Sequence, residues 1–63
     1  MTEWKPTHEH YKHGLYRVIG RGRMEADLSP VVIYDNEAGE IWVRPADDFD
    51  QKDPFVRFAE LQQ

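Results

Sequence analysis

The side chains best suited to chemistry in this chain are arginines interleaved with aromatic residues. Arg17, Arg21 and Arg23 follow one another along a predicted strand and its end, where they would line one basic edge of a barrel. Tyr11 and Lys12 would lie nearby, across a hairpin. Small β-barrels bind single-stranded nucleic acid with such basic and stacking residues. The alternative is a solvated basic face that balances the acidic remainder of the chain, and we favour this second interpretation.

Trp42 and Arg44 form a second candidate pair, because alternate residues of a strand share a face. An exposed pair of this kind could stack on a base or hold a carboxylate or phosphate. The alternative is that Trp42 belongs to the core and that Arg44 pairs with Asp47 or Asp48. A chain with few large hydrophobic residues can hardly leave a tryptophan in solvent. We therefore expect the second arrangement.

Three histidines, His8, His10 and His13, lie close to Glu9. Imidazoles with one carboxylate could hold zinc or nickel, and His8 and His10 would share a face of an extended segment. A structural zinc site normally has four ligands, however, and this spacing matches no motif with known mechanics. We expect a polar N-terminal arm, a hydrogen bond from His10 within the first hairpin, and no metal or other cofactor.

The remaining polar groups give no sign of catalysis. Four acids could suggest a cation site, but they lack the spacing and glycine of a calcium loop, so we expect solvated or helix-capping roles for Asp47, Asp48, Asp50 and Asp53. The chain has no cysteine, and its one serine has no histidine nearby in sequence. Phosphate-loop and dinucleotide glycine patterns are also absent. The sequence predicts that the protein is not an enzyme.

Size and charge limit the classes of function. With 63 residues the chain forms one domain whose core is marginal, without room for a large internal cavity. Residues 1–23 carry five basic residues and two acids, a net charge of +3, whereas residues 24–63 carry three and ten, a net charge of −7. An acidic whole argues against strong nonspecific binding of phosphates. No apolar run approaches the roughly 20 residues needed to span a bilayer, and the start of the chain does not resemble a signal peptide, so we expect a cytoplasmic protein without membrane contact.

The pattern of strands and turns predicts a mainly β fold. Strands are expected to begin at Tyr11 and to cover residues 15–21, 31–34, 41–44 and 55–61, with a tight turn at His13-Gly14 and a helical turn over 46–49 that buries Phe49. Gly20 and Gly22 suggest a bulge or bend, and Arg17 and Arg21 would share one face of their strand. This order fits a five-stranded, SH3-like, partly open barrel. Residues 1–8 would form a flexible N-terminal arm and residues 9–61 a single small β-barrel domain.

Most of the chain also resembles domain-of-unknown-function family 1653. The resemblance is carried in order by His10-Tyr11-Lys12, Gly14, Tyr16, Val18-Ile19-Gly20, Pro30-Val31-Val32-Ile33-Tyr34, Trp42-Val43-Arg44-Pro45, Phe49 and Arg57-Phe58. It implies a short, mostly β, bacterial or phage domain and supplies no activity. The chain departs from the family at residues 24–27, where the family has a His-Ser-Glu-Thr stretch, in a shorter loop between Phe49 and Phe55, and at His13, where the family has glycine.

Together these observations predict a noncatalytic interaction module, a cytoplasmic adaptor or regulator that binds an unknown protein as a monomer or weak homodimer. One alternative is a nucleic-acid-binding barrel that uses the basic edge. Another is a metal-binding or enzymatic module formed across a dimer. Divergent loops on a retained framework fit a binding module with a changed partner, and they fit neutral drift as well. If the loop at residues 24–27 is a functional site in the family, that site is altered here.

Overall fold

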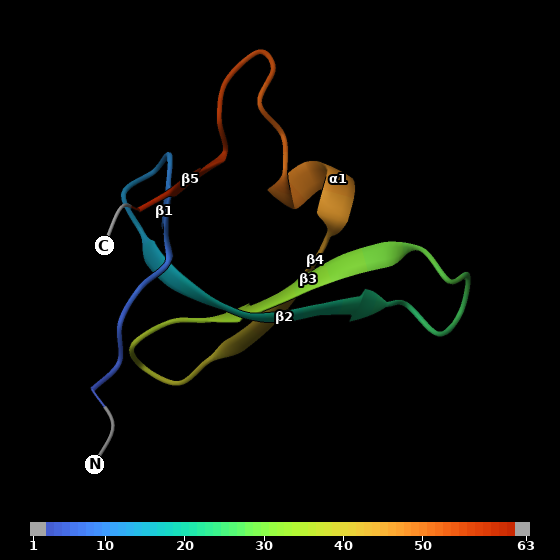
Figure 1. Ribbon diagram of the computed structural model, residues 1–63, viewed down its shortest axis with the longest axis horizontal. Helices are drawn as coiled ribbons and strands as arrows, with labels where there is room; N and C mark the ends of the chain where they lie inside the picture. The colour runs from blue at the N-terminus through green and yellow to red at the C-terminus, as the bar shows by residue number, and fades with distance from the viewer. Residues whose placement is uncertain (1–2, 62–63) are drawn as a thin grey trace.

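The chain forms one antiparallel β-sheet with a short helix, described over residues 3–61 in a computed structural model (Figure 1). The elements follow in the order β1 (His8–His10), β2 (Leu15–Arg23), β3 (Pro30–Asp35), β4 (Ile41–Pro45), α1 (Ala46–Phe49) and β5 (Phe58–Glu60). The predicted mainly β fold, with five strands and a helical turn before the last, is confirmed. Within residues 3–61 no helix is long and apolar enough to cross a membrane.

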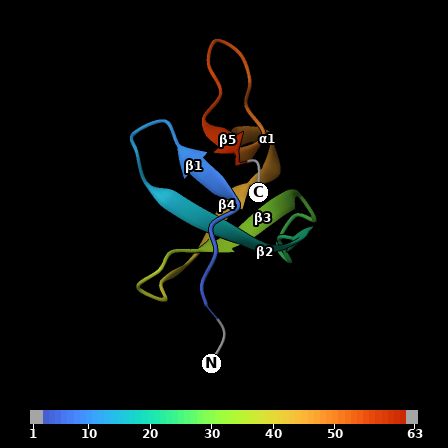
Figure 2. The ribbon, with the colours of Figure 1, turned by 60° about the vertical axis from the view of Figure 1, so that its left-hand side comes forward.

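The strands lie in the order β4-β3-β2-β1-β5, and every neighbouring pair is antiparallel. β2 is the longest strand; its start pairs with β1 and its remainder with β3. The sheet bends along β2, so that β1 and β5 stand at an angle to β3 and β4 (Figures 1 and 2). β4 and β5 are the two edges of the described sheet, which is therefore open and not closed into a barrel.

A β-bulge interrupts β2 where the sequence predicted a bulge or bend. Val18 lies opposite Tyr34, but Gly20 lies opposite Ile33, the next residue of β3, so that Ile19 is the additional residue. A bulge bends its strand and strengthens the local twist. The bend allows one strand to serve both halves of the sheet.

The bulge also inverts the alternation of side chains along β2. Arg17 lies opposite Asp35, whereas Arg21 lies opposite Val32, a fully buried core residue. Opposed residues of an antiparallel pair share a face, and successive residues of β3 alternate between faces. Arg17 and Arg21 are therefore on opposite faces of the sheet. Our prediction that they share a face is wrong, because one additional residue moves all later side chains to the other face.

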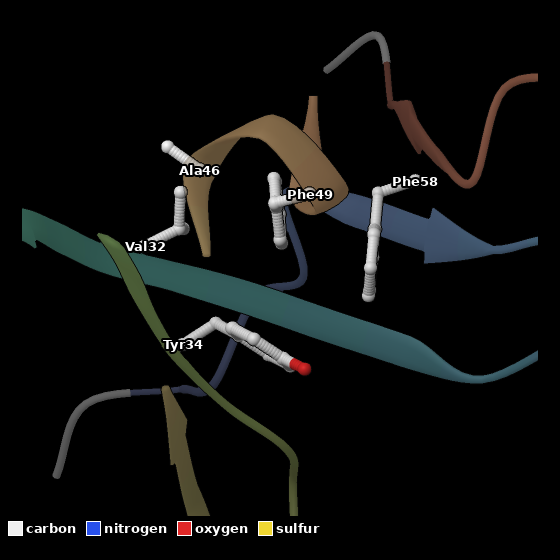
Figure 3. Packing of buried hydrophobic residues seen from close by; sticks show 5 residues of the cluster. All are labelled: Val32, Tyr34, Ala46, Phe49 and Phe58. Atoms are coloured by element: carbon white, nitrogen blue, oxygen red, sulfur yellow. The ribbon is translucent and has the colours of Figure 1, made fainter. Parts of the chain in front are cut away.

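The core lies between the bent sheet and α1. It consists of the buried residues Val32, Tyr34, Ala46, Phe49 and Phe58, with Tyr16 and Val18 packed against them. Phe49 of α1 stacks on Phe58 of β5 with ring centroids 4.2 Å apart and an interplanar angle of 11° (Figure 3). Pro45 ends β4 and lies at the N-cap of the helical turn, which places Phe49 over the sheet as predicted.

The turn between β1 and β2 is closed by two backbone hydrogen bonds. The His13 N–H donates to the His10 carbonyl at 2.7 Å, and the His10 N–H donates to the Gly14 carbonyl at 2.7 Å. The predicted tight turn is confirmed, but its positive φ, 74°, belongs to His13. Gly14 is needed for a different reason: a Cβ there would lie 2.8 Å from a ring carbon of Tyr16.

Replacing His13 with glycine is expected to raise the free energy of unfolding by about 0.5–1 kcal/mol, because only glycine adopts a left-handed φ without steric cost. The ion pair that is lost, His13 with Glu9 at 3.9 Å, is exposed and contributes little. Urea unfolding measures the change. His13→Ala keeps the Cβ and is the control; equal stabilisation by both variants would show that φ is not the cause.

Two strand boundaries differ from the prediction. The first strand begins at His8, not at Tyr11, because the Thr7 N–H already donates to the Tyr16 carbonyl at 2.9 Å. His8, placed in the predicted arm, therefore belongs to the sheet, and residues 1 and 2 of that arm lie outside the described residues. The last strand begins at Phe58, not at Phe55.

Candidate functional site

Arg44 links β4 to α1. Its Nη1 donates to Asp48 Oδ2 at 2.6 Å, its Nε donates to the Tyr34 hydroxyl at 3.3 Å, and its guanidinium lies 5.4 Å from the centre of the Phe58 ring. The predicted pairing of Arg44 with Asp47 or Asp48 is confirmed. Arg44 therefore holds the helical turn against the sheet.

Asp48 is shared between two arginines. Its Oδ1 lies 3.3 Å from Nε of Arg57, whose Nη2 donates to Gln51 Oε1 at 3.1 Å. The Arg57 guanidinium also lies over the rings of Tyr11 and Phe55, at 5.5 and 5.6 Å. A single carboxylate thus connects α1 to β4 and to the loop before β5. The sequence analysis did not single out this second contact of Asp48; the only signal was Arg57-Phe58 within the family resemblance.

Tyr11 is partly exposed and lies in the turn after β1. Its ring is 4.7 Å from that of Phe55 and 4.5 Å from that of His10, and Lys12 Nζ lies 5.6 Å from its centre. Within residues 3–61 the ring and cation partners of Tyr11 are therefore its sequence neighbours, Phe55 and Arg57. They are not the arginines of β2, with which the sequence analysis grouped it.

Arg17 is held by a nearly buried carboxylate. Its Nε and Nη2 donate to the two oxygens of Asp35 at 3.1 and 2.6 Å, and the Trp4 indole N–H donates to Asp35 Oδ1 at 3.1 Å. These hydrogen bonds, that of Arg17 first, hold the pKa of Asp35 below its usual value. The charge of Arg17 is thus balanced within the fold.

Arg21 and Arg23 have separate partners of their own. Both terminal nitrogens of Arg21 donate to the Asp50 carboxylate, at 2.9 and 2.8 Å, and Arg23 Nη1 donates to the Leu28 carbonyl at 3.1 Å. The hydrogen bonds from Arg21 lower the pKa of Asp50. The three arginines of β2 lie on two faces of the sheet, and each has a different hydrogen-bond partner. They therefore do not form the single basic edge that we predicted.

Trp42 is not a core residue, and our expectation of a buried Trp42 is wrong. It lies opposite Tyr34 and shares a face with Arg44, as predicted, yet it is 46% exposed. The reason is the position of β4 at the edge of the described sheet, where no neighbouring strand covers one of its sides. Its neighbours Ile41 and Val43, which are 65% and 55% exposed, lie on the opposite face.

The outer face continues the apolar surface of β4 across the sheet. Val43, Ile33 and Gly20 form one cross-strand row. Gly20 has no side chain, and a Cβ built there would meet nothing within 4 Å. Ile19, the bulge residue beside Gly20, is 52% exposed. We call Ile41, Trp42 and Val43 the β4 edge segment. It presents three consecutive large apolar side chains to solvent.

Two grooves on the surface are lined largely by residues that the sequence analysis did not propose as a site. One, of about 520 Å³, lies between the β1–β2 turn and the β3–β4 loop and includes Trp4 and Glu37. The other, of about 260 Å³, lies under the loop after α1 and includes His8 and Arg21. Of the predicted site residues only Arg21 lines either groove. The grooves therefore do not combine the predicted residues into one site.

The histidines are distributed over the β1 hairpin. The rings of His8 and His10 pack edge-on against Phe49 and Phe58, with centroids 5.2 and 4.8 Å apart, so the two histidines share a face of β1 as predicted, and this face is directed to the core. His10 Nδ1 accepts the Lys12 N–H at 3.1 Å, which confirms its expected hydrogen bond within the hairpin. Within residues 3–61 no cluster of three or more histidine and acidic side chains could hold a metal ion.

Stability is expected to fall as the pH decreases through the ordinary histidine pKa of 6.5. Burial is the main cause that lowers the pKa of His8 and of His10 in the folded protein. As the pH falls, the unfolded chain therefore takes up protons at a higher pH than the folded protein does. The free energy of unfolding is highest above pH 6.5 and decreases as the pH falls toward the lower pKa values of the folded state. Urea unfolding at about pH 8 and about pH 5.5 measures this loss. His8→Gln/His10→Gln should reduce it; an equal pH dependence in that variant would contradict the assignment.

The acids near α1 do not cap it. Pro45 occupies the N-cap position, and no side chain bonds the first N–H groups there, so the predicted capping role is not found. Asp48 and Asp50 instead bind Arg44, Arg57 and Arg21. Asp47 is exposed.

A comparison with known protein families matches residues 6–60 to the family described as Protein of unknown function (DUF1653). No curated protein and no solved structure matches the chain. The match spans both halves of the sheet, α1 and the β4 edge segment. The chain therefore belongs to the DUF1653 family, to which no activity is assigned.

Proposed function

We propose that the protein is a noncatalytic interaction module of the cytoplasm that binds a partner protein through the β4 edge segment. The observation that supports this most strongly is the exposure of Ile41, Trp42 and Val43 on a strand that has one side unpaired in the sheet of residues 3–61. Soluble proteins seldom expose neighbouring large apolar residues on a sheet edge unless another molecule covers them. Aromatic residues such as Trp42 are enriched where protein partners bind.

The internal ion pairs make the nucleic-acid alternative the weaker one. Arg17, Arg21 and Arg44 each have a carboxylate within 2.8 Å. A phosphate would have to displace these carboxylates or tolerate their charge, and the electrostatic attraction that drives nucleic-acid binding would be reduced. The absence of a shared basic edge supports the same preference.

Affinity capture from lysate of the source organism tests this function. The wild-type protein is expected to retain one protein that remains after nuclease treatment. Trp42→Ala should weaken its retention about tenfold or more, because a half-buried tryptophan at an interface is a typical hot spot. Binding of the purified partner by calorimetry gives the ratio.

Val56→Thr provides the matched control, because Val56 is similarly exposed but lies in the loop before β5. It should bind the partner as the wild type does. Retention that disappears with nuclease, or equal loss in Trp42→Ala and Val56→Thr, would reject the proposed function. Turnover of a substrate that is lost on changing one polar residue would also reject it.

A further inference from the structure

The last hydrogen bond of the β3–β4 hairpin fixes the direction of the backbone groups in β4. The Asn36 N–H donates to the Glu40 carbonyl at 3.2 Å. In an antiparallel ladder, hydrogen-bonded pairs alternate with pairs that are not bonded. Trp42 and Arg44, in step with Glu40, therefore direct their N–H groups toward β3.

Ile41 and Val43, the residues between them, direct their N–H and carbonyl groups to the free side of β4. No strand pairs there within residues 3–61. Pro45 ends this row, and the N–H that it lacks would also have faced the free side, as is usual for proline on an edge strand. The free side of β4 is thus a short template with two N–H donors, set between exposed apolar side chains.

The other sheet edge has a different character. β5 has three residues, of which the one large apolar side chain, Phe58, is already buried in the core. A strand added there would gain little apolar contact. The β4 edge is therefore the edge suited to strand addition.

One acidic residue directly precedes β4, and another follows it in α1. Glu40 directly precedes Ile41, and Asp47 follows in the first turn of α1; both are exposed. The one arginine of β4, Arg44, pairs with Asp48, which it shares with Arg57. A bound strand would thus find apolar contacts in the middle and negative charge at each end.

We propose that the free side of β4 binds an extended segment of a partner protein by strand addition, and that this segment has apolar residues flanked by lysine or arginine. The inference rests on the proposed function and names its mode and partner chemistry. Backbone hydrogen bonds to an edge give affinity, and alternate side chains give specificity. Opposite charges at the two ends add complementarity and discriminate against acidic segments.

A second copy of the chain is a poorer occupant. An antiparallel pair of β4 strands related by a two-fold axis at Val43 would set Glu40 of each copy near Asp47 of the other. Like charges would then meet at both ends, which is unfavourable. Five residues on each side would also bury far less than the roughly 800 Å² per partner of a stable interface.

Nuclear magnetic resonance titration tests the proposal with two synthetic peptides. Both contain alternating valine and threonine; one is flanked by two lysines at each end and the other by two glutamates. The lysine peptide should shift the amide signals of Ile41 and Val43 and slow their hydrogen exchange. It should bind about tenfold or more tightly than the glutamate peptide, with the difference reduced by salt.

Val43→Pro removes an outward N–H without breaking the internal ladder and should reduce binding of the lysine peptide about tenfold or more. Val43→Thr keeps the N–H and is the matched control. If Val43→Pro does not fold, hydrogen exchange in the wild type still tests the proposal. The amides of Ile41 and Val43 must exchange more slowly with the lysine peptide bound than without it.

Several outcomes would overturn the proposal: no binding of the lysine peptide, equal binding of both peptides, equal affinity of Val43→Pro and Val43→Thr, or self-association without peptide. These failures are distinct from failure of the proposed function. A lysate partner whose retention is lost in Trp42→Ala but unchanged in Val43→Pro would support the interaction module and reject strand addition.

Discussion

Replacing Phe49 with alanine is expected to lower the free energy of unfolding by about 3–5 kcal/mol. Phe49 is 2% exposed, stacks on Phe58, and contacts the rings of His8 and Tyr34 at 5.2 and 5.4 Å. It is the large side chain by which α1 enters the core. A domain of this size has a small margin of stability, so the variant should be largely unfolded at room temperature. Urea unfolding followed by circular dichroism measures the change.

Phe55→Ala removes the same side chain from an exposed position and is the control. Its loss should be about 1 kcal/mol or less, limited to contacts with Tyr11 and Arg57. Equal destabilisation by the two variants would contradict the description of the core.

Replacing Asp48 with alanine is expected to cost about 2–3 kcal/mol, because it leaves two partly buried arginines without their acid. Arg57 Nε is buried and makes no hydrogen bond, so Asp48 is the charge that compensates it. Full burial would make the loss larger, but the side chains of Arg44 and Asp48 are 30% and 39% exposed. Urea unfolding at neutral pH gives the value.

Asp47→Ala is a closely matched comparison, since it makes the same change one residue earlier in α1. Asp47 is exposed, and its replacement should alter stability by about 0.5 kcal/mol or less. If both variants were equally stable, the contacts of Asp48 with Arg44 and Arg57 would not support the fold.

The pairing of Arg44 with Asp48 could be predicted because its determinants are local. Pro45 ends the strand, a helical turn follows, and Asp48 then comes one turn after Arg44. The burial of Phe49 has the same local origin. The mainly β fold followed similarly from runs of β-branched and aromatic residues such as Val31 to Tyr34.

The exposure of Trp42 could not be predicted, because it depends on the position of its strand in the sheet. A strand at the edge and a strand in the centre can have the same apolar sequence, and only the topology places β4 at an edge. The face of the sheet on which Arg21 lies was predicted wrongly for another reason. Gly20 indicated a bulge, but the assignment of side chains to faces assumed an unbroken alternation along the strand. One additional residue reverses this alternation for every residue that follows it.

The most direct test of the central claim is retention of a lysate partner after nuclease treatment, compared at low and high salt. The claim is that the arginines support the fold while the β4 edge segment binds a protein. It predicts a protein that survives nuclease, remains bound at high salt, and is lost with Trp42→Ala. Retention that nuclease abolishes, or that falls by orders of magnitude with salt and depends on Arg17, Arg21 and Arg23, would contradict it.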